Sequence, residues 1–348
     1  FTVGNGRTGI WIGGGAKNHL IGGTASGARN LISGNRSNGG YIGDSTTTSN
    51  TVQGNYIGTN VSGTLALGNS STGVYVYNSP NNLIGGTAGG AGNLISGNNW
   101  GLSIYGTTAS GNLVQGNLIG TDAMGTGKIA NTWDGVYLGG GAKNNVIGGA
   151  AAGARNLLSG NKQSGIQLRD SATTGNLVQG NYIGTDISGT AALGNASQGG
   201  LSYQAMNNVI GGAAGGVGNL ISGNSWYGIW IYGGVAASGV QGLGIGDQGL
   251  GIGEPAGAAN PVGLPPGNPE DSSPTASGAG QGMERRGDTV SGEFSPPPQP
   301  PISPSGVGVT AVVSNVIQGN VIGLNASGAA KLGNYYGVYI SHGATNGV

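Results

Sequence analysis

The sequence predicts an all-β solenoid, and three observations carry that prediction. Certain phrases return at a fixed interval, 80 of the 348 residues are glycine, and short alternating apolar segments open each unit. A fixed period in several independent phrases is typical of architectures in which successive units stack. The Ile-Gly-Gly phrase begins at Ile21, Ile84, Ile147 and Ile210, which are evenly spaced along the chain.

Each unit contains short segments of the form Gly-h-x-h, where h is an apolar residue. Such alternation in β-branched and aromatic residues predicts a strand with one buried face. Two of these strands in each repeat define two coils of unequal length, a shorter one from Gly73 to Gly101 and a longer one from Gly101 to Gly135. The strands start at Gly9, Gly73, Gly101, Gly135, Gly165, Gly228 and Gly337.

The rest of each coil predicts two more short strands separated by Asn and Gly corners. Both residue types tolerate the left-handed backbone region that tight corners need. The longer coils also contain an extended loop, at residues 60–64, 122–126 and 186–190. Strands this short cannot bury a face alone, so equivalent strands of successive coils should pair into parallel sheets. We expect the repeated corner residues Asn35, Asn98, Asn161 and Asn224 to form a hydrogen-bonded ladder.

Composition excludes several classes of function. Twelve basic and twelve acidic residues give no net charge, and only 7% of residues are charged, against about 25% in an ordinary domain. No basic surface is therefore expected for nucleic acid or anionic lipid. Cysteine is absent, and no apolar run is long enough to insert into a membrane. The chain starts at Phe1 and stops inside a phrase at Val348, so we expect an excerpt of a longer array.

The repeat resembles a known family of folds. Gly-h-x-h, a gap of about ten residues, and Asn-x-Val-x-Gly-Asn, as at Asn112, are similar to the Asn/Gly-rich repeat of secreted and surface proteins with a right-handed parallel β-helix, the pectate-lyase-like class. The resemblance covers about 290 of the 348 residues and implies a single-stranded helix of about ten coils, two in each repeat, roughly 48 Å long at about 4.8 Å per coil. It implies no one activity, because the class includes lyases, hydrolases, epimerases, phage tailspikes and surface adhesins.

The repeat is interrupted once. Residues 243–310 are rich in Gly and Pro, and no Ile-Gly-Gly occurs where it is due near residue 273. We therefore expect a β-helix over residues 1–242, an irregular insertion over 243–310, and continued β-helix over 311–348. The insertion is either a tolerated exposed segment or a lid, linker or partner-binding loop.

Acidic residues in the regular part do not form an evident catalytic pair. Asp122 and Asp186 recur at the loop position of Asn60, which favours a turn role. Asp44 and Asp170 each close an opening strand, but they lie four coils apart, about 19 Å. Glycosidic chemistry needs two carboxylates within about 10 Å. The remaining acids here are Asp134 and Asp247.

Basic residues and histidines give no site either. Arg29 and Arg155 recur with the repeat, as do Lys17 and Lys143, which favours a structural role over a unique active site. The two histidines, His19 and His342, are isolated, and no metal-ligand spacing occurs. We expect no metal and no cofactor.

One arrangement points to a ligand. In Gly-h-x-h the residue x faces outward, and in alternate coils it is aromatic; two coils span about 9.6 Å, close to the length of a disaccharide. Aromatic side chains at that spacing could stack on sugar rings, although aromatic residues also favour sheet faces for packing alone. The candidate ligand-binding residues are Trp11, Tyr75, Tyr137 and Tyr339 in alternate coils and Trp230 in an intervening coil.

We therefore predict a structural β-solenoid segment of a secreted or cell-surface, adhesin-like protein, with a polysaccharide as candidate partner. The alternative is a polysaccharide lyase, glycoside hydrolase or epimerase; enzyme activity is the less favoured prediction. The third candidate is a filament or phage-spike segment that associates end to end. In the enzyme alternative the catalytic groups would come from the insertion, as Asp247, Glu254, Glu284, Arg285 and Asp288.

Overall fold

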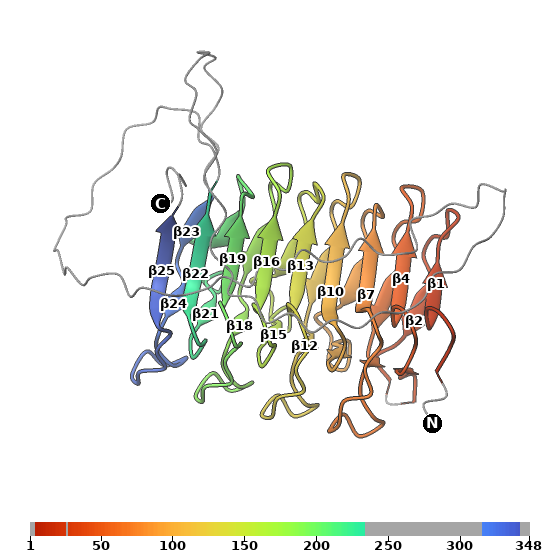
Figure 1. The fold of residues 1–348 in the computed structure, drawn as a ribbon, viewed down its shortest axis with the longest axis horizontal. Coiled ribbons are helices and arrows are strands. Elements are labelled where there is room, and N and C mark those ends of the chain that lie inside the picture. The colour runs from red at the N-terminus through yellow and green to blue at the C-terminus, as the bar shows by residue number, and fades with distance from the viewer. Residues whose placement is uncertain (1–3, 26, 234–314, 342–348) are drawn as a thin grey trace, which may run out of the picture. The chain divides into compact units, whose positions relative to one another are not determined.

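The computed structural model describes residues 4–25, 27–233 and 315–341. Within these residues the regular secondary structure consists of 25 short β-strands, and every strand pair is parallel (Figure 1). The strands form three sheets, which follow one another along each coil and which we call sheets 1, 2 and 3.

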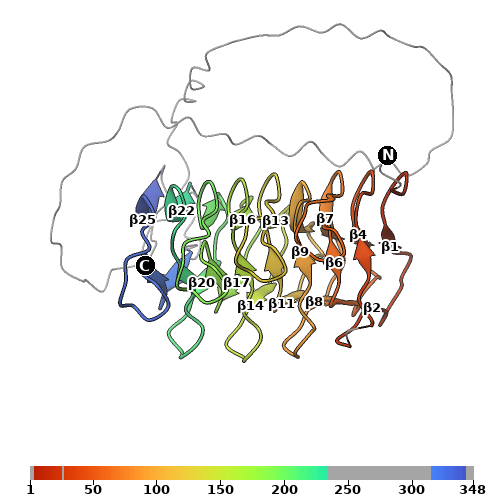
Figure 2. The same cartoon turned by 90° about the horizontal axis from the view of Figure 1, so that it is seen from below.

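Sheet 1 has nine strands, and sheets 2 and 3 have eight each. Sheet 1 consists of β1 (Ile10–Ile12), β4 (Gly40–Gly43), β7 (Thr72–Tyr77), β10 (Trp100–Tyr105), β13 (Val136–Gly139), β16 (Ile166–Arg169), β19 (Gly200–Tyr203), β22 (Tyr227–Tyr232) and β25 (Tyr336–Ser341). Sheet 2 consists of β2 (Leu20–Gly22), β5 (Thr51–Gln53), β8 (Leu83–Gly85), β11 (Leu113–Gln115), β14 (Val146–Gly148), β17 (Leu177–Gln179), β20 (Val209–Gly211) and β23 (Val316–Gln318) (Figure 2). Sheet 3 consists of β3 (Leu31–Ile32), β6 (Tyr56–Ile57), β9 (Leu94–Ile95), β12 (Leu118–Ile119), β15 (Leu157–Leu158), β18 (Tyr182–Ile183), β21 (Leu220–Ile221) and β24 (Val321–Ile322).

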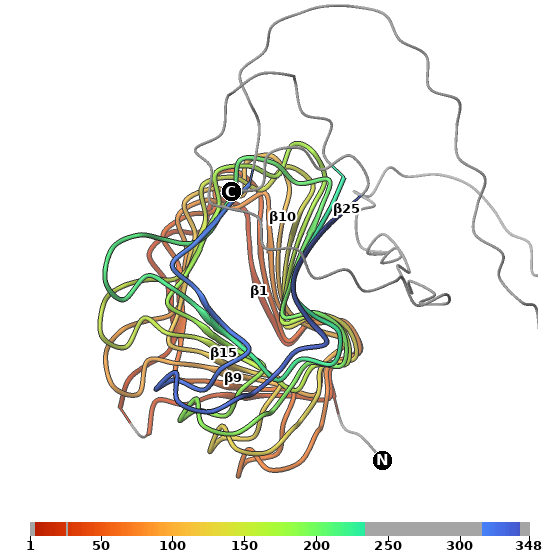
Figure 3. The ribbon, with the colours of Figure 1, turned by 90° about the vertical axis from the view of Figure 1, so that its left-hand side faces the viewer.

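This order is that of a right-handed parallel β-helix, as the resemblance implied. The chain passes through sheets 1, 2 and 3 in every coil, and the coils superpose when viewed along the axis (Figure 3). Crossover connections between parallel strands are almost always right-handed. The strand register confirms the two predicted coil lengths, because Leu102 pairs with Val74 in the coil before it and with Val136 in the coil after it. Each of these three residues directly follows the glycine that opens its predicted strand.

The sequence pattern missed two strands of sheet 1. Strands β4 and β19 begin with Gly40 and Gly200, where the other coils have an apolar residue, and β19 also has Ser202 in place of the second one. Ser202 is buried, and its hydroxyl donates to the carbonyl of Ala205 at 3.1 Å. The nine strands that the described residues contribute to sheet 1 agree with about ten coils.

The regular coils resume after the interruption. Strand β23 pairs with β20, β24 with β21, and β25 with β22, so residues 316–341 complete the coil next to residues 209–232. The predicted insertion, residues 243–310, and both of its boundaries lie outside the described residues and stay a prediction.

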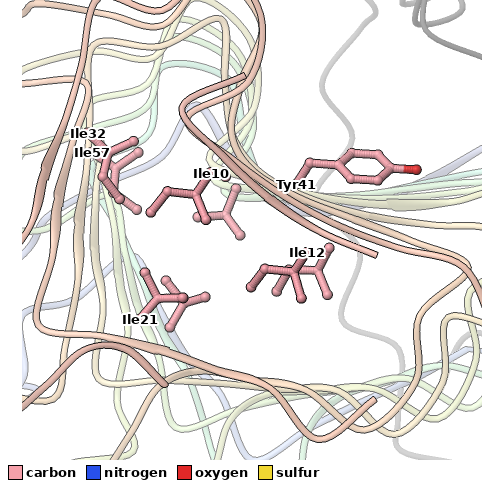
Figure 4. A pocket seen from close by; sticks show the side chains of 10 residues that line it. Ile10, Ile12, Ile21, Ile32, Tyr41 and Ile57 are labelled. Atoms are coloured by element: carbon pink, nitrogen blue, oxygen red, sulfur yellow. The ribbon is translucent and has the colours of Figure 1, made fainter. Parts of the chain in front are cut away.

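The interior consists of stacked Ile, Val and Leu side chains from all three sheets. Figure 4 shows this for the first coils, where Ile10, Ile12, Ile21 and Ile32 point inward while Tyr41 points away from them. Burial of each such side chain contributes about 1.5–3 kcal/mol. The inward rows are therefore the main source of stability.

A ladder of hydrogen-bonded asparagine side chains runs along each of the three corners of the coils. This confirms the predicted ladder. In each ladder the side-chain oxygen of one asparagine accepts the side-chain N–H and, in nearly every step, also the backbone N–H of the asparagine one coil earlier. Asn98, for example, accepts both from Asn69, at 3.1 and 2.8 Å. The predicted residues belong to the ladder Asn5, Asn35, Asn69, Asn98, Asn131, Asn161, Asn195, Asn224 and Asn334.

The extended loops explain why the sequence repeats every two coils. These loops, which we call roof loops, are residues 59–66, 121–128, 185–192 and 324–331, and each is closed by an antiparallel bridge. Each one hydrogen-bonds to the roof loop two coils away; the N–H of Ala123 donates to the carbonyl of Gly63 at 2.9 Å. A roof loop thereby covers sheet 3 of the shorter coil between them. Leu94 is 2% exposed beneath such loops, whereas the equivalent Leu31, before which the described residues contain no roof loop, is 47% exposed.

Candidate functional site

The outer face of sheet 1 carries the predicted aromatic row. The outward position x runs through all nine strands, and a second outward position lies two residues further on. Position x is occupied by Trp11, Tyr41, Tyr75, Ser103, Tyr137, Gln167, Leu201, Trp230 and Tyr339. The second position is occupied by Gly13, Gly43, Tyr77, Tyr105, Gly139, Arg169, Tyr203, Tyr232 and Ser341.

Five aromatic rings form a continuous group over β1 to β10. The rings of Trp11 and Tyr41 are stacked with centroids 4.0 Å apart, and Tyr41 meets the edge of Tyr75 at 5.7 Å. The group continues from Tyr75 to Tyr77 at 5.8 Å and from Tyr77 to Tyr105 at 6.3 Å. Trp11 is 58% exposed and Tyr105 is 37% exposed, so this group, which we call the N-terminal aromatic group, presents rings to solvent.

A second aromatic group lies over β19, β22 and β25. The rings of Tyr203 and Tyr232 are stacked at 4.7 Å, and Tyr227 contacts Trp230 at 5.3 Å and Tyr339 at 5.0 Å. The indole N–H of Trp230 donates to the hydroxyl of Ser341 at 3.1 Å. We call these rings the C-terminal aromatic group.

The arrangement corrects the predicted row in two respects. A further aromatic residue, Tyr41, fills the coil between Trp11 and Tyr75 and touches both rings. Tyr137 and Trp230 face outward but are only 6% and 7% exposed, so neighbouring side chains cover them. Whether the five predicted residues bind a ligand stays a prediction.

Glycine at the second position gives the ring at position x room to lie flat. A Cβ atom on Gly139 would be 2.7 Å from Cε1 of Tyr137, and one on Gly13 would be 2.9 Å from the indole nitrogen of Trp11. A ring folded over a strand glycine shields the backbone there. This pairing explains how Tyr137 is buried although it points away from the interior.

A buried carboxyl group lies between the two aromatic groups. Asp134, just before β13, is 5% exposed, and its Oδ1 atom accepts the backbone N–H of Ser164 at 2.9 Å. Burial raises the pKa of Asp134 to about 6; hydrogen bonds from Ser164 and the charge of Arg169 oppose the rise. Burial, with the nearby Asp170 carboxylate, also raises the pKa of Tyr137 above its ordinary value. A carboxyl group with a pKa near neutrality suits proton transfer or charge-dependent binding.

Sequence reasoning assigned Asp134 no role. Its signal was available, because the repeat aligns it with neutral residues in the other described coils. A carboxyl group at a position that is otherwise neutral is a departure from the repeat. Because Asp134 directly precedes Gly135, the Gly-h-x-h phrases already align it with Thr72, Trp100, Ser164 and Tyr227.

The other acids have local roles. Asp122 and Asp186 accept backbone N–H groups of their own roof loops, as predicted; Asp186 accepts that of Thr190 at 2.9 Å. Asp44 and Asp170 close β4 and β16, four coils apart, and each accepts a backbone N–H of the preceding coil. The insertion candidates Asp247, Glu254, Glu284, Arg285 and Asp288 lie outside the described residues.

The recurring basic residues also have local roles. The guanidinium groups of Arg29 and Arg155 lie 3.8 Å from the ring centroids of Tyr56 and Tyr182 on sheet 3. Within the described ranges, no three His, Asp or Glu side chains gather as a metal site would require. No helix in that same part of the chain is long and apolar enough to cross a membrane.

Comparisons with known proteins give one likeness. No protein-family model and no curated protein matches the chain. Among solved structures, the chain is similar to the periplasmic alginate epimerase AlgG, with 16% identity and a TM-score of 0.38, and to a point mutant of that protein, with 16% identity and a TM-score of 0.39. Each likeness covers 59% of this chain and 38% of the other chain. At this identity it concerns the fold alone.

Proposed function

We propose that this chain is a structural segment of an extracellular or cell-surface protein, adhesin-like in its architecture, that binds polysaccharide along the outer face of sheet 1. The observation that carries the proposal is the run of contacting rings in the N-terminal aromatic group, from Trp11 on β1 to Tyr105 on β10. Aromatic faces bury the apolar C–H surface of a sugar ring, and their polar edges reach its hydroxyl groups.

The scaffold suits this role because it holds the rings in fixed positions. The rings stand on paired strands whose inward side chains are completely buried, such as Val76 and Ile104. A rigid sheet places successive rings along the axis, which reduces the loss of side-chain freedom on binding. An extended glycan chain laid along the axis would contact several coils at once.

The test is a glycan array probed with wild type and with a face variant, Trp11→Ala/Tyr75→Ala/Tyr105→Ala. Loss of aromatic anchors should weaken binding by about tenfold or more. The matched control is Val61→Ala/Met124→Ala/Ile187→Ala, which removes exposed apolar side chains from the roof loops. The proposal is wrong if wild type binds no glycan, or if the face variant and the control bind equally well.

A carbohydrate-active enzyme is the second candidate, and the buried Asp134 carboxyl group beside Tyr137 is the observation that favours it. Assays for reducing ends and unsaturated products on uronate and neutral glycans test this reading. Turnover that Asp134→Asn abolishes would support it, and absence of turnover on the whole panel would count against it. End-to-end association of the chain also stays a prediction, which sedimentation can test.

A further inference from the structure

The corner between sheets 3 and 1 carries aromatic side chains at two separate places. In each described coil, one corner position stands two residues after the asparagine of the ladder that contains Asn98. Four of the residues at this position are aromatic, and they stand as two pairs in adjacent coils. In order along the chain the position is occupied by Arg7, Ser37, Ser71, Trp100, Trp133, Gln163, Ser197, Trp226 and Tyr336.

The fold does not require an aromatic residue at this corner. The backbone N–H of Trp133 donates to the carbonyl of Asn99 at 2.7 Å, and the N–H of Ser71 makes the equivalent bond to Ser37 at 3.2 Å. The corner therefore closes with a serine as well as with a tryptophan. Clustered apolar side chains that stay open to solvent are typical of interaction surfaces, so the aromatic residues here point to a role in binding.

The first aromatic site is a pair of parallel indoles. The rings of Trp100 and Trp133 have centroids 5.7 Å apart and planes 13° apart, and both side chains are partly exposed. We call them the indole pair. The stack holds each ring in one orientation, which lowers the loss of side-chain freedom when a ligand binds.

The second aromatic site, which we call the corner cluster, consists of Trp226, Tyr335 and Tyr336. Tyr335 contacts Trp226 at 5.9 Å and Tyr336 at 4.9 Å, and Trp226 and Tyr335 are 40% and 60% exposed. Tyr336 also stacks on Tyr227 at 5.4 Å, and Tyr227 belongs to the C-terminal aromatic group. The corner cluster therefore continues directly into the proposed ligand surface on sheet 1.

The two sites are four coils apart along the axis. Trp100 and Trp133 lie at the starts of β10 and β13, and Trp226 and Tyr336 lie at the starts of β22 and β25, four strands further along sheet 1. At about 4.8 Å per coil this separation is about 19 Å. In the two coils between them the corner carries polar side chains that reach solvent, namely Lys162, Gln163 and Ser197.

We infer that this corner binds one extended polysaccharide chain, which spans the indole pair and the corner cluster. This inference rests on the proposed function and adds a second line of contacts at the edge of the same face. Sugar rings would stack on the aromatic side chains at both ends. The hydroxyl groups between them would bond to Lys162, Gln163 and Ser197.

The separation of the two sites makes the length of the ligand decisive. A disaccharide spans about two coils, or about 9.6 Å, and reaches only one site. An octasaccharide reaches both, and once one end is bound the other end binds as an intramolecular step at high effective concentration. Affinity should therefore rise steeply between these two lengths.

The experiment is calorimetric titration with the disaccharide and the octasaccharide of β-1,4-linked mannose, xylose and galacturonic acid. For a sugar that binds, wild type should hold the octasaccharide about a hundredfold more tightly than the disaccharide, and Trp133→Ala or Trp226→Ala should each reduce this ratio to less than about tenfold. Trp133→Phe, which keeps a ring, should retain most of the ratio. The matched control is Thr132→Ala/Ser225→Ala, which alters the exposed residues directly before the two tryptophans and should behave as wild type.

The outcomes separate this corner from the proposed function. Binding that Trp11→Ala/Tyr75→Ala/Tyr105→Ala weakens, while both corner variants keep the full ratio, would overturn the corner site and leave the proposed function standing. A ratio that depends on Trp133 but not on Trp226 would overturn the spanning chain. A folded wild type that binds none of these octasaccharides and no glycan on the array would overturn both. Circular dichroism of each variant shows that a loss of binding is not a loss of fold.

Discussion

Asp134 and Asn38 occupy the same position three coils apart and make the same hydrogen bond, to the backbone N–H of Ser164 at 2.9 Å and of Thr72 at 3.1 Å. The amide and the carboxyl group are therefore interchangeable as acceptors for the backbone. They differ in charge, and the amide adds a donor, since the Nδ2 of Asn38 is buried without a hydrogen-bond partner among the described residues. The difference in charge makes the effect of Asp134→Asn on stability depend on pH.

We expect the effect of Asp134→Asn on stability to become more favourable as pH rises. The folded pKa of about 6 lies above the ordinary value of 3.8. The wild type therefore keeps its full stability below pH 3.8 and loses it as pH rises through 6. The difference of about two pH units corresponds to about 3 kcal/mol. An amide at this position also leaves a buried N–H group unpaired, as in Asn38, at a cost of about 1–3 kcal/mol at every pH. Urea unfolding should therefore show a lower free energy of unfolding for the variant at pH 3.5, and a gain of the variant relative to wild type as pH rises to 7.5.

Asp186 provides the control of opposite sign. Burial raises its pKa, but the hydrogen bonds from Ser188 and from its loop backbone together outweigh burial and lower the pKa. Its contribution to stability is present above the ordinary pKa and is lost as pH falls. Asp186→Asn should therefore cost stability at pH 7.5 and not at low pH. Equal pH profiles for the two variants would contradict the assignment of Asp134 as a buried, destabilising carboxyl group.

We expect a leucine-to-alanine substitution to lower stability by different amounts at two equivalent positions, because a roof loop covers only one of them. Leu157 is 1% exposed under the loop that contains Gly125, while Leu31 is 47% exposed. Leu157→Ala should lower the free energy of unfolding by about 2–5 kcal/mol, and Leu31→Ala by less than about 1 kcal/mol. Chemical denaturation of both variants measures this difference. Similar costs would mean that the roof loops do not bury sheet 3.

The asparagine ladder predicts a similar contrast between two adjacent residues. Asn98 accepts two hydrogen bonds from Asn69 and donates to the carbonyl of Ile57, all in the interior. Asn98→Ala leaves these groups unpaired and should cost about 2–4 kcal/mol. Asn99 is partly exposed and donates once, to Ser70, so Asn99→Ala should cost less than about 1 kcal/mol. Thermal unfolding of the two variants tests this contrast. Equal melting temperatures would mean that the asparagine ladder does not stabilise the protein.

Much of the fold was predictable from the sequence because the same phrases recur in successive repeats. The Ile-Gly-Gly and Asn phrases located the coils and the ladder, since inward rows and corners demand the same residue in each coil. The two missed strands, β4 and β19, have glycine at an inward position, where the apolar signal is lost although the backbone pairing persists. Contacts between neighbouring coils, such as those of the roof loop that covers Leu94, could be identified only from the structure.

Less of the candidate site was predictable. Alternation placed Trp11 and Tyr137 on the outer face correctly, because side-chain direction follows from strand periodicity. The exposed fraction of each ring could not be predicted from alternation. It depends on how the ring packs, as the flat packing of Tyr137 over Gly139 shows. The burial of Asp134, and hence its raised pKa, also depends on packing between coils.

The tryptophan residues allow the most direct test of glycan binding to the outer face. All five lie in or just before strands of sheet 1, at Trp11, Trp100, Trp133, Trp226 and Trp230. The measurement is intrinsic fluorescence during titration with a glycan that binds on the array. A glycan on the outer face should shift or quench the emission saturably, and Trp11→Phe should reduce the change. Binding by calorimetry with unchanged tryptophan emission would contradict the account, because the ligand would then lie on another face.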